Sequence, residues 1–281
     1  MQRTPIFVFL LSTVALAAAA CATVESAERA VAEALIPLDQ ENALGEQIHR
    51  QLGQEGIRYI EDPVVLQQVQ QLAAPILQQA KRAAPKMSFH VHVVDNPKSV
   101  NAFATPGGHI YIESGLLQAV DSGAELAGVI AHEAAHVTER HAARNMVQAF
   151  GLQTVAALAL GRDPSQLQQI AAAVVAQGTL LAHSRSQEIE ADETGVVYAT
   201  RAGYDPQGLI AFFGTLQQMT GRTPRALTWV STHPSSEDRI ANLKTYIREH
   251  HLSASGGHES LAGLHQRLQQ QGVGGGGPPQ R

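Results

Sequence analysis

Few short sequences restrict a fold as narrowly as the pentapeptide HEAAH at residues 132–136, which lies in a proline-free run of good helix formers from 123 to 143. Each residue of an α-helix advances by about 100° around the axis. His136 therefore lies about 40°, and Glu133 about 100°, around the helix from His132. Both imidazoles project from one face, where they can bind one metal ion, with Glu133 beside them as a non-ligand. We predict a metal site on a central helix.

Zinc binding is favoured over a solvated polar helix face, because GAELAGVIA, the stretch before the motif, is mostly apolar. A catalytic zinc ion takes three protein ligands and keeps a fourth position for water. One class of zinc protease has its third histidine six residues after the second, but Ala142 stands there. His141 is five residues after His136 and points away from it around a continuous helix. We therefore interpret His141 as a structural or supporting residue.

The third ligand is expected from the segment SRSQEIEADETG at residues 184–195. Glu188 and Asp192 are four residues apart, so they share one face of a predicted helix. Glu188 is the expected third ligand of one Zn²⁺ ion per chain. Asp192 is the expected acid that bonds the second ring nitrogen of a ligating histidine. Glu190 and Glu193 are interpreted as a solvated acidic face.

The remaining periodicities predict an α+β, mainly helical domain with a small β-sheet flanking the HExxH helix. The segment MSFHVHVVD at 87–95 alternates and predicts a strand, and HIYI at 109–112 predicts a second one. His90 and His92 share one face of the first strand. Because no third ligand is nearby in the sequence, we interpret them as surface residues.

Two Ala-rich stretches, at 146–160 and 167–182, predict a pair of helices joined by the turn-forming residues 161–164. Each stretch is short and broken by glutamines, so neither makes a comfortable membrane span. We predict that they form a buried helical hairpin. Contact with a membrane surface is the alternative.

The two ends of the chain differ from the domain between them. Residues 1–20 combine an early arginine, a short apolar run and an Ala-rich end, which predicts a signal peptide rather than a transmembrane anchor. Cys21, the only cysteine, stands at the expected cleavage point. We favour a lipid-modified Cys21 over ordinary cleavage nearby. The predicted divisions are a signal peptide at 1–20, an N-terminal tether at 21–37, the domain at 38–252, and a Gly-rich, largely disordered tail at 253–281. A short helix within this tail is the alternative to full disorder.

Several motifs occur in the order of one known family. They are DQENALGEQI at 39–48, NAFATPGGHIYI at 101–112, HEAAH at 132–136, EIEAD at 188–192 and THPSSEDRI at 232–240. In this order they resemble the HtpX-like, Oma-type and CAAX-prenyl-protease group of zinc metallopeptidases, family forty-eight, of the gluzincin type. The resemblance covers about residues 38–248 and implies a zincin-type domain. The chain looks most like the short LoiP- and BepA-type periplasmic members.

The resemblance implies a role for each matching residue of the metal site. His132, His136 and Glu188 would hold the zinc ion. Glu133 would be the general base of peptide hydrolysis. Asp192 would be the supporting acid of the family's E-x-x-x-D motif.

The resemblance also assigns residues outside the metal site. His233 matches the histidine of the family's H-P motif, which in some relatives approaches the zinc and holds the enzyme closed, and in others helps to bind substrate or to stabilise the oxyanion. Arg239 matches an arginine that would anchor the structure. The residues implied to line the cleft and pair with the substrate backbone are Asn101, Ala102, Phe103, Gly107 and Gly108.

These observations predict a zinc-dependent metalloendopeptidase of the bacterial cell envelope that hydrolyses unfolded or misassembled envelope proteins. The expected location is the periplasm, with outer-membrane attachment through a lipidated Cys21. An extended substrate is expected to add as a strand at an exposed sheet edge near 109–112. With a net charge of −5 and no basic cluster, nucleic acid is not an expected partner. The alternatives are a chaperone-like lipoprotein whose zinc site His233 keeps shut, and a lipoprotein in which zinc only stabilises the fold.

Overall fold

Helix α5 (Gly123–Thr138) is the centre of the fold, and every one of its residues is buried. The computed structural model describes residues 29–30, 32, 34, 36–159, 164–177, 182–220, 227–233 and 237–270. The predicted signal peptide, Cys21 and residues 271–281 lie outside the described residues. The HEAAH motif therefore sits at the centre of the domain, as the apolar stretch before it indicates.

Helix α5 ends five residues before the predicted end of the helix at 143. Arg140 has a φ of 55°, and a new helix, α6 (His141–Ala159), begins directly after it. This left-handed conformation is costly for a residue with a side chain, by about 1–2 kcal/mol. Buried contacts stabilise it, since the Arg140 guanidinium lies 2.6 Å from Glu41 Oε2 and also donates to the Ile36 carbonyl. The break changes the direction of the chain immediately before His141.

A three-stranded sheet lies beside α5, with strand order β1-β3-β2. Strand β1 (His90–Val94) pairs parallel with β3 (His109–Glu113). Strand β2 (Ala102–Thr105) pairs antiparallel with the other side of β3. The prediction of an exposed edge near 109–112 is wrong, because β3 is the middle strand and both of its sides are paired. The edges of this sheet are β1 and β2.

The two faces of the sheet have different neighbours, because successive side chains of a strand point to opposite faces. Ile110 and Ile112 belong to the main apolar core, together with residues of α5. Tyr111, between them, belongs to a separate apolar cluster with Phe103 and Val94. One face of the sheet therefore looks toward the HEAAH helix and the other looks away from it.

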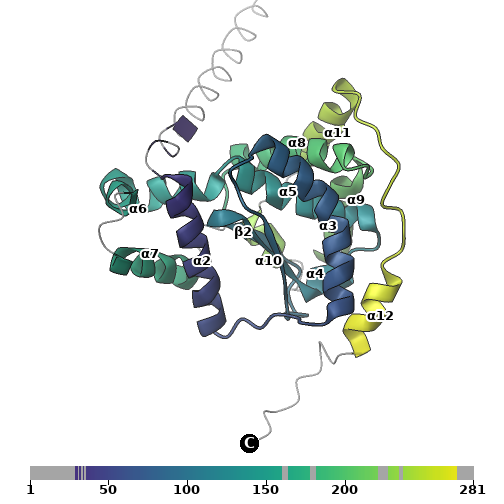
Figure 1. The fold of residues 1–281 in the computed structure, drawn as a ribbon. Helices are drawn as coiled ribbons and strands as arrows, with labels where there is room; N and C mark the ends of the chain where they lie inside the picture. The colour runs from purple at the N-terminus through teal and green to yellow at the C-terminus, as the bar shows by residue number, and fades with distance from the viewer. Residues whose placement is uncertain are drawn as a thin grey trace, which may run out of the picture.

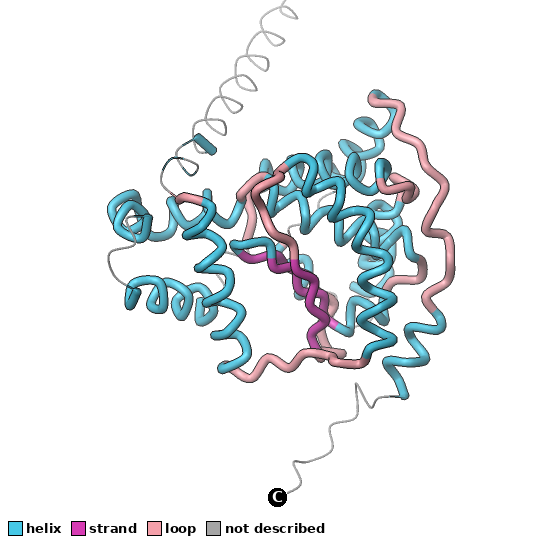
Figure 2. Tube along the Cα trace, in the orientation of Figure 1, coloured by secondary structure: helices cyan, strands magenta, loops and turns pink. Residues whose placement is uncertain are grey.

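Helices cover both faces of the sheet, which Figure 2 shows as the strands between two groups of helices. Helix α3 (Pro63–Ala83) packs with α5, while α2 (Leu38–Gln54) packs with the short helix η1 (Pro106–Gly108) and with α7 (Pro164–Gln177) (Figure 1). The other helices are α4 (Ser114–Ala119), α8 (Arg185–Arg201), α9 (Gly208–Thr220), α10 (Leu227–Thr232), α11 (Glu237–Glu249) and α12 (Ala262–Gln270). The predicted α+β, mainly helical fold class is confirmed.

Helix α8 approaches α5 very closely at the HEAAH motif. A Cβ atom added at Gly195 would lie only 2.9 Å from the backbone nitrogen of His132. Glycine is therefore required where the two helices touch. Ser184 begins α8 with a capping box, in which its side chain accepts from the Gln187 backbone nitrogen and the Gln187 side chain bonds back. These two features fix the distance and the start of the helix that carries Glu188.

The predicted helical hairpin corresponds to α6 and α7. Ile170 and Val174 of α7 are buried against Leu44 and Ile48 of α2 and against Met146 of α6. Among the described residues, no helix combines the length and apolar character that crossing a membrane requires. Helix α2 therefore covers one face of α7, and the burial of α6 and α7 as a hairpin stays a prediction.

The domain continues well past residue 252, where the tail was expected to begin. Leu264 and Leu268 of α12 are almost fully buried in the main core, and Arg267 pairs with Asp62, the N-cap residue of α3. The high glycine content of 253–263 predicts a loose tail, but the leucines that follow it have helical spacing and bury an apolar face. Only 271–281 of the expected tail lies outside the described residues.

Candidate metal centre

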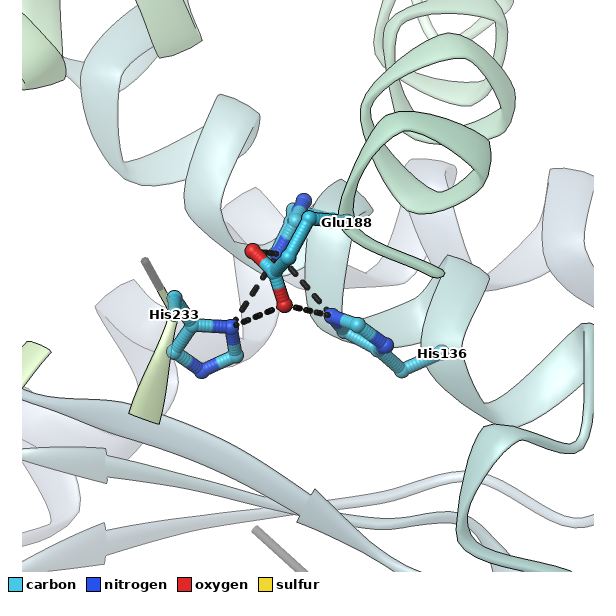
Figure 3. A group of neighbouring side chains, drawn as sticks. His136, Glu188 and His233 are labelled. Carbon is cyan, nitrogen blue, oxygen red and sulfur yellow. Dashed lines mark hydrogen bonds and ion pairs between the residues drawn. The ribbon is translucent and has the colours of Figure 1, made fainter. Parts of the chain in front are cut away.

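The structure brings the side chains of the three predicted metal ligands together between α5 and α8. His132 Nε2 and His136 Nε2 lie 3.0 Å apart. Glu188 Oε2 lies 3.6 Å from His132 Nε2, and Glu188 Oε1 lies 3.5 Å from His136 Nε2. All three side chains are buried, and Figure 3 shows the Glu188 carboxylate between the rings of His136 and His233. Two imidazole nitrogens and a carboxylate from a second helix thus surround one point.

This donor set fits a zinc ion, which binds imidazole nitrogen and carboxylate oxygen. Burial by itself would lower the pKa of His132, but hydrogen bonds to Asp192 and Glu188 outweigh burial and raise the pKa to about 9. Burial would raise the pKa of Glu188, but the neighbouring histidines hold it well below the usual range. The carboxylates and imidazoles thus stabilise each other's charged forms at the place where a metal ion would be held.

Asp192 and Arg239 support two of the ligands from behind. Asp192 Oδ1 lies 3.0 Å from His132 Nδ1, the ring nitrogen that faces away from the site. The Arg239 guanidinium bonds both Asp192 oxygens, at 2.7 and 2.8 Å, and contacts Glu188 Oε2 at 2.6 Å. These contacts fix the ring of His132 and the carboxylate of Glu188 in position. The structure places both residues where the resemblance implies that they act.

His136 is supported by a second, unexpected chain of contacts. His141 does not point away, as a continuous helix would require, because the helix break at Arg140 brings it back. Its Nδ1 lies 2.6 Å from His136 Nδ1, and its Nε2 lies 3.0 Å from Glu190 Oε2. Burial would raise the pKa of Glu190, but bonds from His141 and Arg144 lower it to about 2. Glu190 is therefore not part of a solvated acidic face, and it holds His141 against a metal ligand.

His233 occupies the fourth side of the site. Its Nδ1 lies 3.4 Å from His132 Nε2 and 3.1 Å from Glu188 Oε1. Its Nε2 lies 3.5 Å from Glu133 Oε1. His233 is fully buried, and the Trp229 ring stacks on it with centroids 4.2 Å apart. A fourth imidazole thus faces the three predicted ligands, in contact with both Glu188 and Glu133.

Sequence reasoning missed two rings at the site. The His183 ring stacks on His136 with centroids 3.8 Å apart, and Trp229 stacks on His233. Trp229 belongs to the short helix α10, and His183 precedes α8. No spacing in the sequence relates these positions to the HEAAH motif, because only the folded chain makes them neighbours.

The predicted substrate-binding residues lie along β2 and the turn after it, and all are buried. Asn101 adjoins α10, where its Oδ1 accepts a hydrogen bond from the Thr232 hydroxyl at 3.4 Å. The side chain of Ala102 belongs to the main core. The Phe103 ring points to the opposite face of the sheet, where it stacks on Tyr111. Contact of these residues with a substrate therefore depends on their backbone, and their role stays a prediction.

Gly107 and Gly108 have structural reasons to be glycine. Their φ angles are 76° and 79°, in the region that residues with side chains rarely adopt. A Cβ at Gly107 would press on Asn42 of α2, and one at Gly108 would lie 1.7 Å from the Ser88 carbonyl oxygen. Packing alone explains both glycines, so nothing in the geometry distinguishes a substrate-binding role for them.

Glu133 has the environment of a proton acceptor. It is fully buried, and neither carboxylate oxygen has a hydrogen-bond partner among the described residues. Burial raises its pKa above the ordinary value for glutamate. A carboxylate in this state binds a proton more readily at neutral pH than an exposed one does. It stands next to His132 in the chain, with no ligand role of its own.

Comparison with known proteins agrees with this geometry. The model of the family described as "Peptidase family M48" matches residues 63–247. The chain is 31% identical, over 74% of its length, to the Beta-barrel assembly-enhancing protease of Escherichia coli K12, and 28% identical, over 76%, to the protein of that name from Yersinia pestis. It is 32% identical, over 58%, to the Mitochondrial metalloendopeptidase OMA1 of Schizosaccharomyces pombe. These alignments cover 44%, 45% and 48% of the relatives, so the chain spans about half their length.

Proposed function

Because the chain belongs to peptidase family M48, we propose that it is a zinc-dependent metalloendopeptidase of the bacterial cell envelope. The observation that carries the proposal is the meeting of His132, His136 and Glu188 around one point, with the buried carboxylate of Glu133 beside them. A structural zinc site has no need for that buried carboxylate. A peptide hydrolase needs a base at this place.

In this mechanism each residue of the site would have a distinct role in peptide hydrolysis. His132, His136 and Glu188 would hold a Zn²⁺ ion, and the bound ion would provide Lewis-acid chemistry for peptide hydrolysis. Glu133, whose pKa burial raises, takes a proton from the attacking water and delivers it to the leaving amine. Asp192 keeps His132 in one ring orientation through Nδ1.

Replacing Glu133 with glutamine tests the mechanism, because the amide keeps the shape but cannot accept the proton. We expect casein cleavage to fall by about 10²–10⁴-fold, while the purified protein still binds one zinc ion at this site. A chelator should abolish cleavage by the native protein, and added zinc should restore it. Full activity in Glu133→Gln would rule out this base.

We further propose that the substrates are unfolded or misassembled envelope proteins. In support, β2 is an edge strand beside α5, and an extended peptide can pair with a strand edge through backbone hydrogen bonds. Such pairing is only weakly dependent on side chains, which suits varied unfolded clients. The relatives named beta-barrel assembly-enhancing protease favour an envelope location. Cleavage of reduced, unfolded casein but not of a stably folded protein would support this substrate class; equal cleavage of both would contradict it.

A lipid anchor at Cys21 is part of the proposed location in the outer membrane. Cys21 follows Ala18-Ala19-Ala20, which provides the small residues that signal processing requires. Mass spectrometry of the mature N-terminus is the direct test. A diacylated Cys21 and membrane fractionation that Cys21→Ser abolishes would support the anchor. An unmodified N-terminus would leave a protein free in the periplasm.

A second candidate function follows from the position of His233. Its Nδ1 lies within bonding range of the same point as the three ligands, and a zinc ion with four protein ligands has no place for water. The chain would then act as a chaperone-like envelope protein whose zinc site is shut until the segment carrying His233 moves. Replacing His233 with alanine distinguishes the candidates. Faster casein cleavage would show that His233 inhibits the site, and slower cleavage would show that it assists the reaction.

A further inference from the structure

A second group of histidines lies on the face of the sheet that points away from α5. It consists of His49, His92 and His109, which we call the sheet histidines. From its spacing in the sequence, His92 is expected to be a surface residue without a third ligand nearby, but the fold makes it half-buried and adds the other two rings. We propose that the sheet histidines bind a second divalent transition-metal ion of the kind that prefers imidazole, with Zn²⁺ as the first example.

The sheet histidines converge from three separate elements. His49 is on α2, His92 on β1 and His109 on β3. His92 Nε2 lies 3.0 Å from His109 Nδ1, and the His49 ring stacks on His92 with centroids 4.4 Å apart. One ring nitrogen of each histidine lies within 4.8 Å of the other two. Zn–N bonds of about 2.0–2.1 Å place tetrahedral ligand atoms about 3.4 Å apart, so small ring rotations would suffice.

The surroundings orient these rings as in known metal sites. His109 directs Nδ1 toward His92, while its Nε2 lies 3.5 Å from the carboxylate of Glu46. A ligating histidine commonly has such an acid on its second nitrogen. The Tyr111 and Tyr59 hydroxyls lie 3.1 and 3.3 Å from His49 Nδ1 and hold that ring in place. Both tyrosine hydroxyls contact His49 from outside the group of three histidines, so they do not occupy the space between the three rings.

Burial also affects the pKa of the sheet histidines. Burial lowers the pKa of His92 to about 3 and the pKa of His109 to about 4. Burial therefore favours the neutral form of both rings, which carries a nitrogen lone pair. Neutral imidazole is a good ligand for Zn²⁺, Ni²⁺ and Cu²⁺.

This site is separate from the catalytic centre. His109 and Tyr111 point to the face of the sheet that α2 covers, whereas Ile110 between them packs in the core with α5. A metal ion here would join α2 to β1 and β3, which are far apart in sequence. Its expected effect is therefore to stabilise the fold, because it binds the folded chain and its ligands are dispersed in the unfolded one. The inference does not depend on the proposed peptidase activity.

The test uses the full chain with the first metal site removed, as the double variant His132→Ala/His136→Ala. After chelation and dialysis, titration with Zn²⁺ alone should still show one bound equivalent and a rise in melting temperature. Adding His49→Gln and His92→Gln to this background should remove both effects. As a matched control, His258→Ala, which replaces an exposed histidine elsewhere, should remove neither.

Folding of the variants is checked in the native background. There, His49→Gln/His92→Gln should lower the bound zinc from two equivalents to one and keep the circular dichroism of the folded chain. Loss of the second equivalent only in the sheet variants supports the site. Absence of a zinc equivalent in the His132→Ala/His136→Ala variant, or an equivalent that survives loss of the sheet histidines, would overturn it.

Discussion

At the level of single residues, the two histidines that are predicted to bind zinc have different partners. His132 Nδ1 lies 3.0 Å from a carboxylate oxygen of Asp192, which Arg239 holds with two hydrogen bonds. His136 instead contacts another histidine, which in turn contacts Glu190. Two neutral rings can share one hydrogen only if their tautomers are complementary. The Glu190 carboxylate sets this arrangement, because it accepts the Nε2–H of His141 and leaves His141 Nδ1 as the acceptor for His136 Nδ1–H.

Replacing Glu190 with glutamine should weaken zinc binding at the catalytic site. The amide can no longer impose one tautomer on His141, so the ring of His136 loses its fixed orientation. Removal of such supporting residues typically lowers metal affinity by about 10–100-fold. Competition with a fluorescent zinc chelator measures this change, in a His49→Gln/His92→Gln background that isolates the catalytic site. Glu193→Gln, three residues along the same helix, is the matched control. If the two variants bind zinc equally well, the Glu190–His141 contact has no such role.

At the level of elements, the position of the third ligand depends on how closely α8 packs on α5. Glu188 lies about two turns before Gly195, the point of closest approach. Any side chain at Gly195 would press on the backbone of Ala131 and His132. The separation of the helices therefore determines whether the Glu188 carboxylate reaches the two imidazoles.

Replacing Gly195 with alanine should separate the two helices and weaken the site. Its Cβ would lie 2.9–3.0 Å from backbone atoms of α5, which cannot give way as a flexible side chain can. Overpacking of this kind typically lowers the free energy of unfolding by about 1–3 kcal/mol, and zinc affinity should fall with it. Urea unfolding and zinc competition measure both. Gly214→Ala is the control, because a Cβ at Gly214 meets nothing within 4 Å, and alanine is the better helix former. Equal behaviour of the two variants would contradict this account.

The same elements show which parts of the structure the sequence could predict. The HEAAH helix and the pair Glu188 and Asp192 follow from helical spacing, which is a local property. The end of α5 does not follow from helical spacing, because the left-handed conformation of Arg140 depends on its contact with the distant Glu41. The sheet histidines come together only through long-range packing, and so does the contact between His183 and His136. Local periodicity predicts which side chains share a face, but not which elements meet.

At the level of the whole molecule, the C-terminal segment completes the fold around α5, the helix that carries HEAAH. The first N–H groups of a helix have no partner within the helix. In α5, the backbone nitrogens of Gly123 and Ala124 donate to the carbonyls of Glu259 and Gly257, at 3.2 and 2.6 Å. Figure 2 shows this segment as the long loop that runs from α11 to α12. The segment after residue 252 therefore caps the helix that carries HEAAH.

Truncation should show that this segment belongs to the domain. A chain that ends at Gln270 keeps α12 and should unfold at the same urea concentration as the full chain. A chain that ends at Leu252 loses both of these hydrogen bonds to α5 and exposes the core that Leu264 and Leu268 cover, so its free energy of unfolding should fall sharply. The single change Leu268→Ala should cost about 2–5 kcal/mol, as expected for a buried leucine. Should the chain ending at Leu252 prove as stable as the full chain, the caps and the buried leucines would contribute nothing, and the domain would end where its glycine-rich composition first suggests.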